Sequence, residues 1–275
     1  MKNFKNNEYS FSSRWKSVKE NVDEINIKSL FVDIGKKPVV QRQLNLYYYF
    51  LFIKNILKKI DAKKVLEVGC GRGTASLFIK KYLNIDVTLL DNEPDAINIA
   101  KKEFDKHREK ADFNIGDAFE TQFSDETFDA TVSIGLAEHV NNVEDLFKEQ
   151  YRVLEFGGAM ISLNIPKKFS IQSLNTVMRF IKKLFGFHTE DIRKDYYRNI
   201  LTPEDYKNAA IKAGFKNVEI THVCPFPIYT PIALSTDKKI TAINKSILKI
   251  RGVFQKYPYK TNRLFAQAHF LVAYK

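Results

Sequence analysis

Three glycines in alternate positions, directly after a short apolar run, constrain this chain more than any other feature of its sequence. The run Val65–Val68 is rich in β-branched residues, and Gly69, Gly71 and Gly73 follow it. The segment behind the last glycine has the apolar spacing of a helix, so the pattern predicts a strand, a tight turn and a helix. Glycine permits the sharp turn and lets a ligand touch the main chain. The N-terminus of that helix offers unpaired N–H groups to an anionic or carboxylate-bearing ligand.

Carboxylates belong to the first two predicted strands. Glu67 lies within the apolar run, where a buried carboxylate is costly unless it meets a cationic partner. Asp91 ends the next predicted strand and lies 22 positions after Gly69. A carboxylate at about that distance suits the ribose hydroxyls of a nucleotide-type ligand. The alternative role for Asp91 and its neighbour Asn92 is to cap the helix that Pro94 opens.

The spacing of the glycines distinguishes between two families of nucleotide-binding folds. A nicotinamide fingerprint would place its third glycine three residues after Gly71, where this chain has Thr74. That spacing disfavours a nicotinamide oxidoreductase. The acidic form that runs from Glu67 to Gly73 is instead similar to motif I of the class I S-adenosylmethionine-dependent methyltransferases, and further acidic and glycine positions follow in that family's order.

The resemblance covers residues 63–165 well and extends weakly to 201–224 and the final strand. It implies an α/β fold: a Rossmann-like, seven-stranded, mostly parallel sheet with helices on both faces and its last strand antiparallel. We expect residues 1–62 to be an N-terminal helical segment that packs on the core. Residues 63–275 would form the methyltransferase domain, with insertions at about 167–200 and 225–263.

Periodicity and turn signals predict the individual elements. The predicted helices are 46–60, 74–82, Pro94 to about Lys110, 142–154 and one that starts at Pro203; the predicted strands are 65–68, 86–91, 113–118, 128–134, 159–165, 218–223 and 268–274. We expect the third strand to end in Asp117. Gly157 and Gly158 are expected to end the helix before the fifth strand.

The resemblance also implies which residues bind the cofactor S-adenosylmethionine. Motif I corresponds to Glu67, Gly69, Gly71 and Gly73; the ribose site to Asp91 with Asn92; the adenine site to Asp117 and Ala118; and the backing of the methionine moiety to Ile134 and Gly135.

A catalytic base is expected just past the fourth strand. A sulfonium methyl needs alignment with its acceptor and exclusion of water, and a hydroxyl acceptor also benefits from a base. His139 is the first candidate, because histidine accepts protons near neutral pH, and Glu138 is the second. The alternative is that His139 only packs or caps the following helix. We therefore expect O-methylation of a small-molecule or glycan-type acceptor, with no metal.

Three other functions remain open. The stretch Ser133–Val140 is also similar to the fourth-strand motif of lipid-acting cyclopropane fatty-acid synthases, although Asp91–Pro94 departs from that family's pattern. A nucleic-acid methyltransferase is disfavoured, since Leu136–His139 stands where amino-methylating enzymes carry an Asn/Asp-Pro-Pro-aromatic tetrad. A non-catalytic cofactor-binding protein would share the same fold.

The charge of the chain is unevenly distributed. The net charge is +12, yet residues 63–165 carry −7, residues 1–62 carry +6 and residues 166–275 carry +13. Basic flanks suit an anionic acceptor or an anionic membrane surface, and a bias toward solvated lysines is the plain alternative. A basic helical pattern at 171–184 is expected to cover the acceptor pocket as a lid in preference to lying on a membrane.

The remaining composition favours a cytoplasmic protein. The N-terminal residues lack an apolar signal-peptide core, and the longest apolar run, 46–53, is far shorter than the ~20 residues that span a bilayer. The chain has two cysteines, Cys70 and Cys224, which do not suggest a disulfide framework. The sequence leaves the oligomeric state open.

Overall fold

The computed structural model of the protein describes residues 30–33, 40–165, 184, 198–223, 234–259, 261, 266 and 268–275. Its strands are β1 (Lys64–Val68), β2 (Asp86–Asp91), β3 (Asp112–Ile115), β4 (Phe128–Ile134), β5 (Leu154–Asn164), β6 (Asn217–Val223) and β7 (Ala268–Tyr274). Its helices are α2 (Gln41–Lys59), α3 (Thr74–Leu83), α4 (Pro94–His107), the 3₁₀ turn η1 (Ala137–His139), α5 (Val143–Val153), α7 (Pro203–Lys212) and α8 (Leu234–Phe254).

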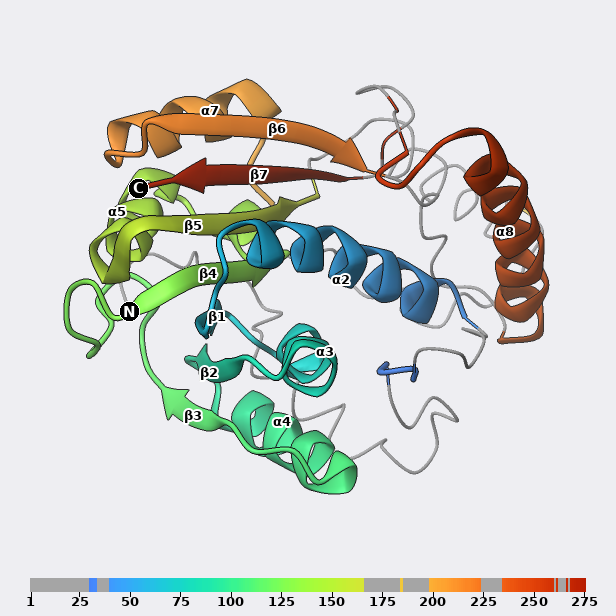
Figure 1. The fold of residues 1–275 in the computed structure, drawn as a ribbon, viewed down its shortest axis with the longest axis horizontal. Helices are drawn as coiled ribbons and strands as arrows, with labels where there is room; N and C mark the ends of the chain where they lie inside the picture. Colours follow the sequence, from blue (N-terminus) through green and yellow to red (C-terminus); the bar gives the residue numbers. More distant parts are fainter. Residues whose placement is uncertain are drawn as a thin grey trace.

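The strands form one seven-stranded sheet in the order β3-β2-β1-β4-β5-β7-β6 (Figure 1). The strands from β3 to β5 pair in parallel, and β7 pairs antiparallel with both β5 and β6. The predicted Rossmann-like sheet with an antiparallel last strand is confirmed. The order changes direction beside β1, so the carboxyl ends of β1, β2 and β4 frame the crevice in which open α/β sheets bind ligands.

Two helical layers cover the sheet. The first layer is α2, α3 and α4, whose apolar side chains pack with one face of the strands in a single buried cluster. The second layer is α5 and α7, which close the opposite face (Figure 1).

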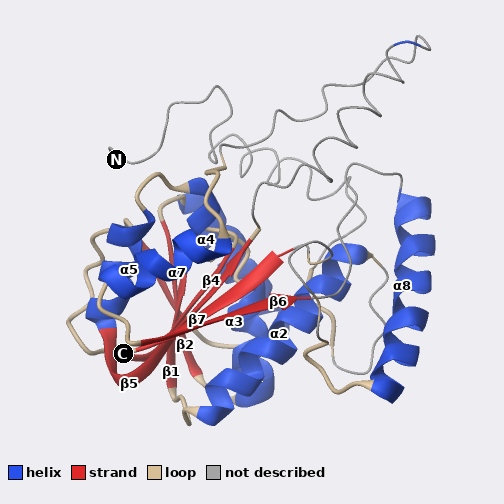
Figure 2. Cartoon of the chain, turned by 90° about the horizontal axis from the view of Figure 1, so that it is seen from above, coloured by secondary structure: helices blue, strands red, loops and turns tan. Residues whose placement is uncertain are grey.

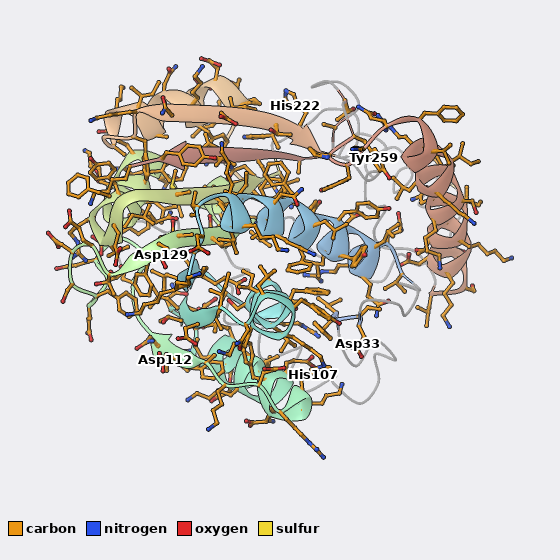
Figure 3. The ribbon with its side chains drawn as sticks, in the orientation of Figure 1. Asp33, His107, Asp112, Asp129, His222 and Tyr259 are labelled. Carbon is orange, nitrogen blue, oxygen red and sulfur yellow. The ribbon has the colours of Figure 1, made fainter. Side chains whose placement is uncertain are left out.

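The amino ends of the neighbouring strands β1 and β4 are linked by a side chain. The carboxylate of Asp129 accepts hydrogen bonds of 2.7 Å from the backbone N–H groups of both Lys63 and Lys64, which joins β4 to β1 (Figure 3).

Local sequence signals set most helix boundaries. Pro94 occupies the first turn of α4, and Asn84 and Arg108 end α3 and α4 in the left-handed conformation. Thr202 caps α7 in a capping box with Asp205. Because Arg108 adopts the left-handed conformation, α4 ends at His107, whereas the helix was predicted to reach about Lys110.

Two further predictions about where elements end were wrong. Gly157 and Gly158 lie inside β5 and do not end the preceding helix, which stops at Val153. The backbone N–H of Gly157 donates to the carbonyl of Lys275 at 3.2 Å, and the pairing with β4 shifts register next to it. The extra residues of this irregularity extend the strand back to Leu154.

The other error concerns Asp117, which lies two residues beyond β3 and not at its end. Its side chain accepts a hydrogen bond from the backbone N–H of Phe119 at 3.0 Å, which forms a turn after the strand.

The segment before β1 contributes α2 to the first helical layer. Phe52 of α2 stacks on Phe270 of β7 with ring centroids 4.2 Å apart. The division of the chain at residue 62 stays a prediction. Residues 1–29 of the expected N-terminal helical segment lie outside the described residues. So does the helix expected at 171–184, apart from the single residue Leu184, while the second expected insertion contains α8. Among the described residues, no helix is both long and apolar enough to cross a lipid bilayer.

Candidate functional site

A cavity opens at the carboxyl ends of β1, β2 and β4. Its lining residues are Leu30, Arg42, Leu46, Glu67, Gly69, Cys70, Gly71, Arg72, Thr74, Ala75, Leu90, Asp91, Asn92, Gly116, Asp117, Ala118, Ile134, Gly135, Leu136 and His139. The structure thus brings together nine of the ten residues expected at the cofactor site and the first candidate base. The tenth cofactor residue, Gly73, and the second base candidate, Glu138, lie outside the lining.

The glycine turn is held against β2 by main-chain hydrogen bonds. The N–H groups of Gly69 and Cys70 both donate to the carbonyl of Leu90, at 2.9 and 3.0 Å. The glycines at 69, 71 and 73 all have positive φ angles, between 53° and 68°. These conformations disfavour residues with a side chain, and the turn brings the end of β1 next to the end of β2.

Asp91 is fixed beside the glycine turn by two backbone donors. One carboxylate oxygen accepts from the N–H of Gly71 at 2.8 Å, and the other accepts from the N–H of Glu93 at 3.0 Å. The residue is buried, and burial raises the pKa of its carboxyl group while the two N–H groups oppose that shift. Each carboxylate oxygen has a further lone pair, so hydroxyl groups in the cavity would find an acceptor already oriented.

Glu67 joins β1 to the helix behind the turn. Its buried carboxylate accepts a 2.9 Å hydrogen bond from the N–H of Ser76 in the first turn of α3. The N-terminus of α3 thus takes the place of a cationic side chain, because it offers N–H donors and a positive dipole end. Burial raises the pKa of Glu67 to about 7.

Gly73 has a packing role. A Cβ added at this position would come within 2.5 Å of the Leu89 side chain, and Ala100 and Phe104 of α4 lie nearby. Since Gly73 does not line the cavity, its absent side chain lets α3 approach β2 and α4 closely.

The remaining cofactor candidates line the cavity on either side. Asp117 and Ala118 lie in the turn after β3, and Ile134 and Gly135 lie at the end of β4. Gly135 is tied to the neighbouring strand, since its N–H donates to the carbonyl of Leu163 at 2.9 Å.

The two base candidates differ in environment. His139 faces the cavity with a side chain about 10% exposed, whereas the side chain of Glu138 is 1% exposed and lies beneath Gly135. Nε2 of His139 and Oε1 of Glu138 are 4.0 Å apart. Burial raises the pKa of Glu138 to about 7, opposed mainly by the charge of Arg198. A proton acceptor at the cavity surface thus has a second titratable group directly behind it.

Asn199 holds the turn that carries these two residues. Its backbone N–H donates to the carbonyl of Glu138 at 2.7 Å, and its side-chain amide donates to the carbonyls of Ala137 at 2.8 Å and Val140 at 3.1 Å. Its side-chain oxygen accepts from the hydroxyl of Tyr206 at 2.8 Å. Asn199 is 8% exposed, so these hydrogen bonds are shielded from solvent.

Sequence reasoning missed Asn199 and the part of the cavity wall that comes from before β1. Arg42 and Leu46 of α2, together with Leu30, line the cavity, and Arg72 of the glycine turn adds a second cation. The helical pattern of α2 was visible in the sequence, but nothing in it indicated which face would meet the crevice. Asn164, which stands at the end of β5, is fully buried and hydrogen-bonded to Ser162.

These donors and acceptors fit a nucleoside-bearing cofactor. Asp91 offers carboxylate oxygens suited to hydroxyl groups, Asp117 offers one suited to an amino group, and apolar side chains line the same cavity. Among the described residues, no group of three His, Cys, Asp or Glu side chains has a metal-binding arrangement.

The sequence matches a family model described as a methyltransferase domain over residues 65–158. The chain is 34% identical over 100 residues to the sterol 24-C-methyltransferase of Aspergillus fumigatus, an alignment that covers 36% of this chain and 26% of that enzyme. It is 28% identical over 176 residues to the demethylmenaquinone methyltransferase of Thermotoga maritima, which covers 60% of this chain and 75% of that enzyme. The chain therefore spans about a quarter of the length of the sterol enzyme.

The fold as a whole is similar to solved structures. The crystal structure of the 4+2 cyclase SpnF superposes with a TM-score of 0.59 at 15% identity, over 96% of this chain and 94% of that one. A likeness at this level of identity concerns the fold alone.

Proposed function

We propose that this chain is a class I S-adenosylmethionine-dependent methyltransferase that transfers a methyl group from that cofactor to a small-molecule acceptor, since residues 65–158 match a methyltransferase-domain model. The single observation that carries the proposal is the cavity, in which Asp91, Asp117 and His139 meet at one edge of the sheet. A fold shared with a cyclase does not define a reaction, so the proposal rests on these residues.

The chain's own residues bind and orient the cofactor. Asp91, held by the N–H groups of Gly71 and Glu93, accepts from the ribose hydroxyls, and Asp117 accepts from the adenine amino group. Ile134 and Gly135 back the methionine moiety at the end of β4. S-adenosylmethionine supplies a methyl group already activated on a sulfonium sulfur, so the protein's task is alignment and exclusion of water.

We further propose that the acceptor atom is a hydroxyl oxygen and that His139 takes its proton. Support comes from the place of His139 on the cavity surface, next to Leu136 and close to the end of β4. A neutral imidazole is a competent base near pH 7. Glu138 lies behind the turn and is better suited to influence His139 than to contact the acceptor.

The cavity wall favours an acceptor with an apolar body and an anionic or strongly polar group. Leu30, Leu46 and Leu136 supply apolar surface, and Arg42 and Arg72 supply positive charge. The names of two relatives agree with an acceptor that has an apolar part, since these proteins are named for a sterol and for demethylmenaquinone. A glycan is the more polar alternative.

Methylation on carbon or nitrogen is the competing reaction. The sterol relative is named a C-methyltransferase, and another relative, from Rauvolfia serpentina, is named ajmaline N-methyltransferase. An amine would depend less on His139, because the lone pair of its neutral form attacks before the nitrogen loses a proton. Methylation on carbon still has to release a proton to a base.

The test is product analysis with S-adenosylmethionine labelled in its methyl group. Purified protein is incubated with a panel that contains a prenylated hydroquinone, a sterol, an aliphatic amine and a sugar phosphate. Mass spectrometry then locates the label on oxygen, nitrogen or carbon. We expect label on the oxygen of an apolar acceptor. Label on nitrogen or carbon would contradict the oxygen assignment, and tight cofactor binding with no labelled product from any acceptor would favour a non-catalytic binding protein.

A further inference from the structure

Helix α8 presents an apolar stripe to solvent. Ile243, Ile247, Ile250 and Phe254 follow one another at spacings of four, three and four residues, which places them on one face of the helix. They are 59%, 42%, 62% and 85% exposed, and the neighbouring Val253 is 78% exposed. Scattered apolar residues on a surface need no explanation, but a continuous stripe over three turns of one helix does.

The opposite face of α8 is anchored to the rest of the molecule. Leu248 packs with Leu44 of α2 and with Tyr259, whose hydroxyl donates to the carbonyl of Leu248 at 3.2 Å (Figure 3). Asp237 accepts a 2.9 Å hydrogen bond from the backbone N–H of Gln41 at the start of α2. The buried face is therefore already satisfied, and the apolar stripe is a separate surface.

Basic residues flank the stripe. Helix α8 carries five lysines and arginines against one acidic residue. Lys239 lies four residues before Ile243, and Arg251 lies four residues after Ile247, so these two cations stand at the edges of the stripe. The helix thus combines apolar side chains on one face with positive charge next to them, the arrangement of helices that lie in a membrane interface.

We propose that α8 docks this protein on an anionic lipid surface. The stripe would enter the boundary between headgroups and acyl chains, and the flanking Lys239 and Arg251 would contact the negatively charged headgroups. Charge favours an anionic lipid surface over a second copy of the chain, because two copies would bring one positive helix against another. The proposal goes beyond methyl transfer, and lipid binding can be measured without any turnover.

The position of α8 links such docking to the cavity. Both views place α8 beside α2, at the edge of the molecule toward which β5 and β6 point (Figures 1 and 2). Helix α2 contacts α8 through Leu44 and lines the cavity through Arg42 and Leu46. Docking through α8 would therefore bring the cavity wall close to the lipid surface, where an acceptor with an apolar body would be dissolved.

The experiment is co-sedimentation of the full chain with phosphatidylcholine vesicles, with and without phosphatidylserine. We expect binding that requires phosphatidylserine and weakens as salt is raised, since salt screens surface charges. Ile250→Ser with Phe254→Ser, and separately Lys239→Glu with Lys249→Glu, should each lower the partition coefficient by roughly 10-fold or more.

Matched controls come from exposed residues elsewhere. Ile211→Ser with Phe156→Ser removes an exposed isoleucine and phenylalanine from α7 and β5, and Lys102→Glu with Lys106→Glu changes the same charge on α4. Both controls should bind like the unmodified protein. The proposal is overturned if the protein does not bind anionic vesicles, or if the α8 variants and their controls bind equally. It is also overturned if sedimentation equilibrium shows a dimer that the Ile250/Phe254 variant abolishes, with no lipid binding.

Discussion

The carboxylate of Asp91 has two roles. It stabilises the glycine turn through the N–H of Gly71, and it presents its remaining lone pairs to the cavity. The carboxylate is therefore preorganised, and a ligand does not have to order it on binding. Such preorganisation makes binding energy sensitive to this one side chain.

Asp91→Ala should weaken binding of S-adenosylmethionine by about 1–3 kcal/mol, since hydroxyl groups of the ligand and N–H groups of the turn would lose their acceptor. Isothermal titration calorimetry measures the change. The matched control is Asp86→Ala at the other end of β2, where the side chain is exposed and pairs with Lys80. Equal affinity in the two variants would remove Asp91 from the binding site.

His139→Ala should leave cofactor affinity unchanged and lower kcat by roughly 10²–10⁴-fold, the usual contribution of a positioned base. Calorimetry and single-turnover rates on the same preparation separate the two quantities. A kcat within a few fold of the unmodified value would show that His139 is structural, or that the acceptor is a nucleophile that needs no base.

The turn η1 depends on a residue from a distant part of the chain. Asn199 satisfies three backbone carbonyls of residues 137–140, and Tyr206 of α7 fixes its side-chain oxygen. The capping box at Thr202 sets where α7 begins, so α7 in turn fixes the position of His139 relative to the cavity.

Asn199→Ala should lower the free energy of unfolding by about 1–3 kcal/mol, because two buried carbonyls and a tyrosine hydroxyl lose their partner. It should also lower kcat with little change in cofactor affinity, a combination that a purely structural residue would not produce. Urea unfolding and turnover measure both effects. Asn208→Ala, at an exposed position of α7, is the control and should change stability by less than about 0.5 kcal/mol. Unchanged kcat in folded Asn199→Ala protein would contradict this role.

Local signals allowed much of the fold to be predicted. The strands that end at Asp91, Ile134 and Tyr274 have the predicted bounds, because apolar runs bounded by glycine, proline or charge depend on neighbouring residues alone. The irregularity at Gly157 could not be predicted in the same way, since its partner is the backbone of Lys275.

Nine of the predicted cofactor residues lie together because strand ends of a parallel sheet meet at one edge. Arg42 and Asn199 were not predicted for a different reason. Their positions depend on how α2 and α7 pack on the sheet, and no residue pattern within either segment records that packing. The donor that meets Glu67 was missed because it is a backbone N–H, which any residue at position 76 would carry.

The stability of the whole molecule should respond to the protonation of Glu138. Burial raises the pKa of this carboxyl group to about 7 from 4.5, so the folded state favours the protonated form. The stability that this preference contributes is complete below pH 4.5 and is lost as the pH rises through 7. Between these limits, the unmodified protein should lose about 3 kcal/mol relative to Glu138→Gln, which has no such titration. Urea unfolding at a series of pH values measures the difference, and parallel stability curves would contradict the assignment.

Ile165, directly after β5, and Arg198 are 33 positions apart in the sequence and lie next to each other. A guanidinium nitrogen of Arg198 donates to the carbonyl of Ile165 at 3.3 Å, and the next residue, Asn199, binds the turn that carries His139. A hydrogen bond thus joins the two ends of this interval, and both ends belong to the part of the chain that the structure describes. Replacing the intervening residues with a segment of another length would leave both ends, the sheet and the candidate base in register. The framework that holds the cofactor site is therefore closed by contacts that do not depend on the residues between Ile165 and Arg198.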